Sequence, residues 1–174
     1  MLKVICLFIL LIAVSNAAVR EITFNSGNII QGKFATGVTL TKNSKGQTVI
    51  EWKEQFDSDN ALTIYLSHIY EKTGIVEVVE VSNLCSNYER GSFADIIKHF
   101  LLRKFRGTNK CPLKKGKITI KYPLTNTYEA SSEAKNCGPI VSNMHVVRSK
   151  KPGSNDAPLL FSAQLRGEIS GEGC

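Results

Sequence analysis

Short stretches rich in β-branched and aromatic residues recur along this 174-residue chain, and their close spacing restricts it to a mainly β fold. Clusters of Asn, Asp, Ser and Gly separate the first of these stretches and predict turns at 25–27, 43–46, 57–60 and 72–74. Strands spaced in this way predict an antiparallel meander within a single domain. The predicted strands cover residues 19–24, 37–42, 47–52, 61–68, 75–82, 117–122, 140–149 and 158–170.

One segment, residues 91–107, departs from the strand pattern and predicts an amphipathic helix. Ser92 is a favourable N-cap, Asp95 follows three residues later as an acidic partner, and Gly107 ends the helix. Such a helix packs on a sheet or covers a cavity, and Lys104 lies within its apolar stripe, where the aliphatic stem can reach toward a rim. The large apolar side chains on one face are Phe93, Ile96, Ile97, Phe100 and Leu101.

The N-terminal residues predict a secretory signal peptide at 1–17, because a lysine precedes an apolar run that ends in small residues. One secreted, extracellular domain at 18–174 is then expected. Cleavage removes Cys6 and leaves an even number of cysteines, which predicts two disulfides with three possible connectivities. No C-x-x-C or H-x-x-x-H spacing favours a zinc site instead. The remaining cysteines are Cys85, Cys111, Cys137 and Cys174.

Positive charge is concentrated between Lys98 and Lys121, which contains nine Lys or Arg residues and no Asp or Glu. The whole chain has a net charge of +7, so the rest of it is slightly acidic. The basic block either keeps the protein soluble and protects a sheet edge, or faces lipid headgroups, an anionic membrane or a glycosaminoglycan. Few aromatic residues are interleaved with it, so no nucleic acid is expected as a partner. No later apolar run is long enough for a transmembrane segment.

Catalytic motifs are not evident in the sequence, and a non-enzymatic protein without a cofactor or metal is expected. The three histidines, His68, His99 and His145, each fall inside a regular element. No G-x-S-x-G, H-E-x-x-H or glycine-rich phosphate loop accompanies them. A histidine pair could serve a secreted nuclease or hydrolase, but nothing in the sequence brings two of them together.

The span from Cys85 to Gly116, CSNYERGSFADIIKHFLLRKFRGTNKCPLKKG, resembles the ganglioside activator-like (ML-type) lipid-recognition proteins. It shares the arrangement of a cysteine, a helix, Cys-Pro and x-Lys-x-Gly, followed by a strand. It is also similar to secreted insect relatives, some of them chemosensory. The resemblance covers roughly residues 62–169 and is most specific at NKCPLKKGKITI, residues 109–120.

The resemblance implies an antiparallel β-cup or sandwich of about eight strands, with the helix near the cavity mouth. It implies that Cys85 pairs with Cys111 and that the helix face described above lines the cavity or its rim. We expect Cys137 and Cys174 to pair with each other. A further group of lysines is expected to face an anionic headgroup or membrane surface. These are Lys104, Lys110, Lys114, Lys115 and Lys117.

The predicted function is that of a secreted carrier that binds a lipid or hydrophobic small molecule, such as a semiochemical, in an apolar cavity. The protein is expected to be a monomer that presents its ligand to a membrane or receptor. The alternative is an extracellular interaction protein whose core is filled. Its basic surface, from Lys98 to Lys121, would bind glycosaminoglycan, anionic membrane or an acidic partner.

Overall fold

A computed structural model describes residues 17–131, 136–149 and 157–174. The predicted signal peptide therefore lies outside the described residues except for Ala17, where the first strand begins. The described part contains nine strands in two antiparallel sheets, which confirms the mainly β fold class. Within it, no helix combines the length and apolar character needed to cross a membrane.

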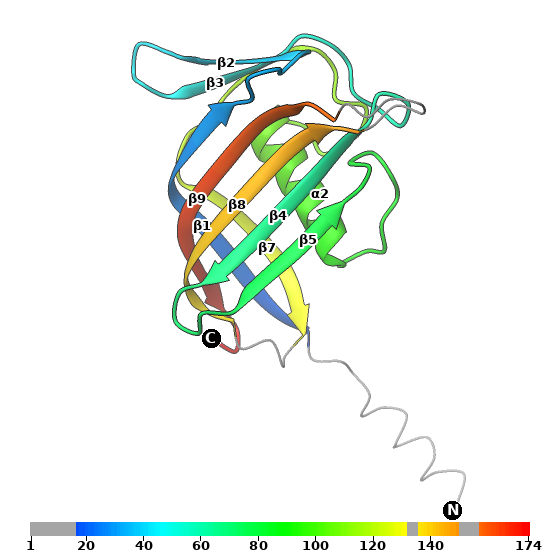
Figure 1. Ribbon diagram of the computed structural model, residues 1–174. Coiled ribbons are helices and arrows are strands. Elements are labelled where there is room, and N and C mark those ends of the chain that lie inside the picture. Colours follow the sequence, from blue (N-terminus) through cyan, green and yellow to red (C-terminus); the bar gives the residue numbers. More distant parts are fainter. Residues whose placement is uncertain (1–16, 132–135, 150–156) are drawn as a thin grey trace, which may run out of the picture.

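The larger sheet has six strands in the order β5-β4-β8-β9-β1-β7 and curls into a half-barrel (Figure 1). Its strands are β1 (Ala17–Gln31), β4 (Leu62–Tyr70), β5 (Val76–Val81), β7 (Leu124–Ser131), β8 (Gly138–Arg148) and β9 (Leu159–Gly171). Only β4–β5 and β8–β9 join sequence neighbours, so the predicted meander is wrong for the order of this sheet. The first strand instead pairs with the last, because β1 lies between β9 and β7.

The smaller sheet covers one end of the half-barrel (Figure 1). It consists of β2 (Val38–Lys42), β3 (Thr48–Trp52) and β6 (Gly116–Thr119) in the order β2-β3-β6. Buried Trp52 attaches it to the rest of the molecule, because the indole Nε1 donates a hydrogen bond to the carbonyl oxygen of Phe105 at 2.9 Å.

Two differences from the predicted strands have local causes. The predicted turn at 25–27 is instead a β-bulge within β1, where the register with β9 shifts between Phe24 and Ser26. Gly27 is required there by packing, since a Cβ atom would lie 2.5 Å from Tyr122 Oη. The predicted strand at 117–122 ends earlier, at Thr119. β7 begins as a separate strand directly after Pro123, which has no N–H for a ladder hydrogen bond.

The helix predicted at 91–107 is confirmed. It comprises α2 (Phe93–Leu101) and a π-helical turn η1 (Leu102–Arg106). Ser92 Oγ accepts a hydrogen bond from the Asp95 backbone N–H at 3.3 Å, and Gly107 ends the helix with φ of 75°.

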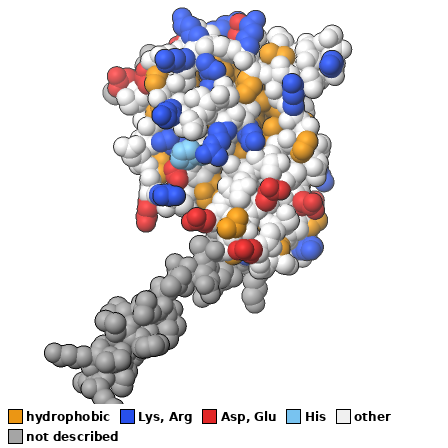
Figure 2. Space-filling view, turned by 180° about the vertical axis from the view of Figure 1, so that it is seen from behind, with side chains coloured by type: hydrophobic (Ala, Val, Ile, Leu, Met, Phe, Trp, Pro, Cys, Tyr) orange, Lys and Arg blue, Asp and Glu red, His pale blue; other side chains and the backbone are white. Residues whose placement is uncertain are grey.

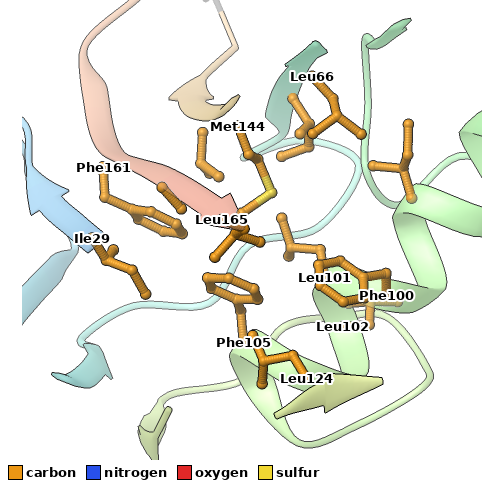
Figure 3. Close-up of a cluster of buried hydrophobic side chains, with 14 of the residues drawn as sticks. Ile29, Leu66, Phe100, Leu101, Leu102, Phe105, Leu124, Met144, Phe161 and Leu165 are labelled. Atoms are coloured by element: carbon orange, nitrogen blue, oxygen red, sulfur yellow. The ribbon is translucent and has the colours of Figure 1, made fainter. Parts of the chain in front are cut away.

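The helical segment packs into the concave side of the larger sheet and completes the core. The Phe105 ring stacks on Phe161 of β9 with centroids 5.9 Å apart, and Phe100 contacts Phe24 of β1 edge-on at 5.7 Å. Figure 3 shows these helical side chains meeting those of the sheet, with Leu165 between them. The helix thus replaces the strands that a closed barrel would use to fill this side.

Two disulfides, in the pairing expected above, join segments that lie apart along the chain. Cys85 and Cys111, with Cα atoms 5.7 Å apart, lie before and after the helical segment. Cys137 and Cys174, 5.5 Å apart, join the start of β8 to the tail after β9. The first disulfide holds both ends of the helical segment. The second holds the C-terminal tail at the end of the half-barrel opposite the smaller sheet (Figure 1).

Candidate functional site: an apolar cavity beneath helix α2

An apolar cavity of about 50 Å³ lies between α2 and the concave face of the larger sheet. Four of the five predicted ligand-binding residues line it from the helix side: Phe93, Ile96, Ile97 and Phe100. The fifth, Leu101, is fully buried in the core and does not line the cavity. Apolar side chains from the sheet line the opposite side, namely Ile22, Phe24, Leu66, Met144, Leu165 and Ile169.

The cavity volume determines what can enter without a change of conformation. Pockets for drug-sized ligands measure roughly 300–1,000 Å³, so a space of about 50 Å³ has room for only a few water molecules. A lipid chain therefore requires α2 to move away from the sheet. Periodicity alone cannot distinguish a filled from a hollow cup, and the structure has an almost filled one.

An open groove of about 570 Å³ runs along the outside of this cavity, between α2 and the edge strand β7. Ile96, Asn126 and Tyr128 line both spaces, so these three side chains form the partition between them. The groove is more polar than the cavity and carries Arg90 and Arg103. On the other side of α2 the helix packs against β5. The groove and the cavity therefore share one wall, formed by these three side chains.

The helix side of the molecule carries an uneven charge distribution. Figure 2 shows Lys and Arg side chains gathered on the upper part of this face and Asp and Glu on its lower part. The predicted headgroup lysines line neither the cavity nor the groove. Lys117 pairs with Glu51 at 3.3 Å, while the carbonyl oxygens of Lys114 and Lys115 accept hydrogen bonds from Arg106. Their role toward an anionic headgroup stays a prediction.

A small number of polar groups interrupt the apolar lining on the sheet side. His68 Nδ1 and Ser142 Oγ are hydrogen-bonded at 2.6 Å across the β4–β8 ladder. Burial lowers the pKa of His68 to about 4, so the ring is neutral at physiological pH. Tyr70 Oη donates a hydrogen bond to Glu77 Oε2 at 2.6 Å, and burial, followed by this carboxylate, raises the pKa of Tyr70. Such isolated polar groups orient a ligand in an apolar site.

Ser142 and His68 are residue types that can act as a nucleophile and its base. Acyl transfer also needs a group that orients the base and donors that stabilise an oxyanion. Across the residues that the structure describes, His68 and Ser142 make no side-chain hydrogen bond except to each other. The other two histidines lie elsewhere, since His99 lines the groove and His145 contacts Ser162 on the exposed face.

Sequence reasoning missed three arginines, one next to the cavity-lining residues of β1 and two in the groove. Arg20 is only 2% exposed, because it occupies an inward position on β1, in phase with Ile22 and Phe24. Strand alternation places residues i and i+2 on one face, so the sequence already indicated a charged residue on the apolar face of this strand. Arg90 and Arg103 of the groove carried no comparable signal, since their placement depends on how the helix sits against β7.

Comparisons with known proteins do not add a relative. No protein-family model matches the chain, and no curated protein matches it. Among the described residues, no three His, Cys, Asp or Glu side chains gather as a metal site would require.

Proposed function

We propose that this protein is a secreted binding protein that holds a lipid or another hydrophobic small molecule between α2 and the concave face of the six-stranded sheet. The observation that carries the proposal is the apolar cavity beneath α2, with four large helix side chains over it and an open groove beside it. The resemblance to ganglioside activator-like proteins supports it. Binding requires no catalysis, and the two disulfides suit an extracellular protein.

Helix displacement is the step that the geometry requires for uptake. The Cys85–Cys111 link keeps both ends of the helical segment in place while the middle of α2 moves outward. The ligand then replaces the contacts that the helix loses with the sheet. Each Å² of apolar surface removed from water contributes about 25 cal/mol, so one long acyl chain offsets the loss of several helix contacts.

Native mass spectrometry of the secreted protein, followed by organic extraction, tests the proposal directly. A stoichiometric adduct with the mass of a lipid or other apolar molecule supports it and identifies the ligand class. A bare chain that takes up neither an added fatty acid nor its alcohol contradicts it. If that bare chain also elutes from heparin in a salt-dependent manner, the alternative of an interaction protein with a basic surface replaces it.

Ile96 is the position at which binding can be tested with the least damage to the fold. Its side chain is partly exposed and lies in the partition between the cavity and the groove. We expect Ile96→Asp to weaken binding of oleyl alcohol about tenfold or more, because a carboxylate must be desolvated against an acyl chain. Displacement of a fluorescent fatty probe measures this affinity.

The matched control is Ile75→Asp, since Ile75 is 50% exposed and lies outside both spaces. It should bind oleyl alcohol as the native protein does. Equal affinities for the two variants would place the ligand somewhere other than beneath α2.

A further inference from the structure

A buried arginine lies near the start of β1, close to residues that line the cavity. Arg20 is 2% exposed and shares the concave face of β1 with Ile22, which lines the cavity. It faces Tyr128 directly in the β1–β7 ladder, and Tyr128 also lines the cavity. Burial raises the pKa of Tyr128, while the charge of Arg20 opposes that rise. The guanidinium is therefore within electrostatic reach of a cavity-lining phenol.

The guanidinium of Arg20 lacks partners among the residues that the structure describes. Its Nε and Nη2 atoms are buried without a hydrogen bond, and no described ion pair includes it. The carboxylate of Glu77 accepts a hydrogen bond from Tyr70 and forms no described ion pair with Arg20. Arg148 provides the contrast, since its guanidinium contacts Glu54, Asn60 and the Thr36 carbonyl. A buried unpaired cation is strongly unfavourable, so the site favours an anion.

The identity of the two unpaired nitrogens indicates the shape of that anion. Nε and Nη2 lie along one edge of the guanidinium, and their N–H bonds run side by side. This edge matches the two oxygens of one carboxylate, which it binds through two parallel, charge-assisted hydrogen bonds.

The surroundings restrict the rest of the ligand. On one side the C-terminal tail covers the guanidinium, since a Cβ atom at Gly173 would lie 3.7 Å from Nη2, and the Cys137–Cys174 disulfide holds that tail. On the other side lies the apolar cavity. Because the disulfide-linked tail lies close to Nη2, a compact carboxylate is favoured over a bulky phosphodiester headgroup, which would have to displace that tail.

We propose that Arg20 binds the carboxylate of a fatty acid or similar carboxylate-bearing lipid, whose apolar chain occupies the cavity and points toward the groove beside α2. The inference rests on the proposed function and specifies its ligand class and orientation. The carboxylate of the ligand lies inward, at Arg20, and the methyl end of its apolar chain lies nearest to solvent. The polar groove then contacts the chain end or remains free for a membrane surface.

The test compares oleate, oleyl alcohol and acetate on the native protein, Arg20→Met and Arg148→Met, by titration calorimetry. The native protein should bind oleate at least about tenfold more tightly than the alcohol, which corresponds to one charge-assisted interaction. Arg20→Met should bind both ligands within about twofold of each other. Arg148→Met, which also removes a partly buried arginine, should keep the native preference.

Each outcome decides between the claims. Equal binding of oleate and the alcohol by the native protein overturns the head-inward assignment but leaves lipid binding intact. Binding of neither ligand overturns both proposals. Acetate that binds as tightly as oleate indicates a site for a free small anion and overturns the lipid assignment. A preference that persists in Arg20→Met places the carboxylate elsewhere.

A second measurement covers the case in which Arg20→Met does not fold. Oleate labelled with ¹³C at its carboxyl carbon is bound to the native protein, and its chemical shift is followed as pH falls. Contact with Arg20 should keep the carboxylate ionised to a pH well below that at which oleate in neutral detergent becomes protonated. Titration at the detergent value contradicts the proposal.

Discussion

Replacing Phe105 with alanine is expected to lower the free energy of unfolding by about 3–5 kcal/mol. The ring is fully buried, stacks on Phe161 and contacts Phe100 edge-on with centroids 6.0 Å apart. Its removal leaves a cavity where the helical segment meets the sheet, and the surrounding side chains are held by both. Urea denaturation followed by circular dichroism measures the change. The loss approaches the whole stability of many small domains.

Phe34→Ala is the matched control for this prediction. Phe34 is 73% exposed, and its ring is approached by Lys33 Nζ at 5.4 Å from the centroid. Its removal should change the free energy of unfolding by less than about 0.5 kcal/mol, as at most surface positions. Comparable losses for the two variants would mean that the helical segment does not pack on the sheet as described.

Acidification from pH 6.5 to about 4 is expected to lower stability by up to about 3 kcal/mol through His68 alone. Burial lowers the pKa of His68 to about 4 in the folded protein, against 6.5 for the unfolded chain. Between these values the unfolded state binds more protons, so the free energy of unfolding falls as pH falls. Below about pH 4 both states are protonated at this residue, and its contribution stops changing. Urea titrations at a series of pH values measure the slope.

Two substitutions separate this effect from other titrations. His68→Gln keeps a hydrogen-bonding side chain beside Ser142 and should flatten the slope between pH 6.5 and 4. His145→Gln should retain it, because His145 makes a similar contact to Ser162 at 2.8 Å but lies on the exposed face. Asp57, whose pKa is lowered mainly by the Asn60 backbone N–H, acts only at lower pH. A native slope in His68→Gln would show that another group titrates in this range.

The helix was the most predictable element because local signals specify it at both ends. Ser92 occupies the N-cap, where its hydroxyl accepts a backbone N–H, and Gly107 occupies the C-cap, where a positive φ favours glycine. Helical spacing identified the face that packs on the sheet. The strand segments were also recognisable, although their order was not. Pairing of β1 with β9 depends on contacts between distant parts of the chain, which alternation within one strand does not encode.

The candidate site was predictable only on its helix side. Phe93, Ile96, Ile97 and Phe100 followed from periodicity, whereas the size of the cavity depends on how side chains of five strands fill the space opposite. Arg20 was readable in principle, as a charge in phase with Ile22, but its lack of a partner is a property of the folded molecule. The groove residues depend on the position of α2 relative to β7.

The pairing of β1 with both β7 and β9 has a consequence for the biogenesis of the protein. Ile22 of β1 pairs with Ile169 of β9, so an interior ladder of the six-stranded sheet joins segments made at very different times during translation. Contacts so distant along the chain form slowly, because a long loop must close before they contribute. Both edges of β1 stay unpaired until β7 has been synthesised, and the edge that pairs with β9 stays open to intermolecular strand addition until β9 follows. Chaperone binding to the nascent β1 segment would protect it during this interval.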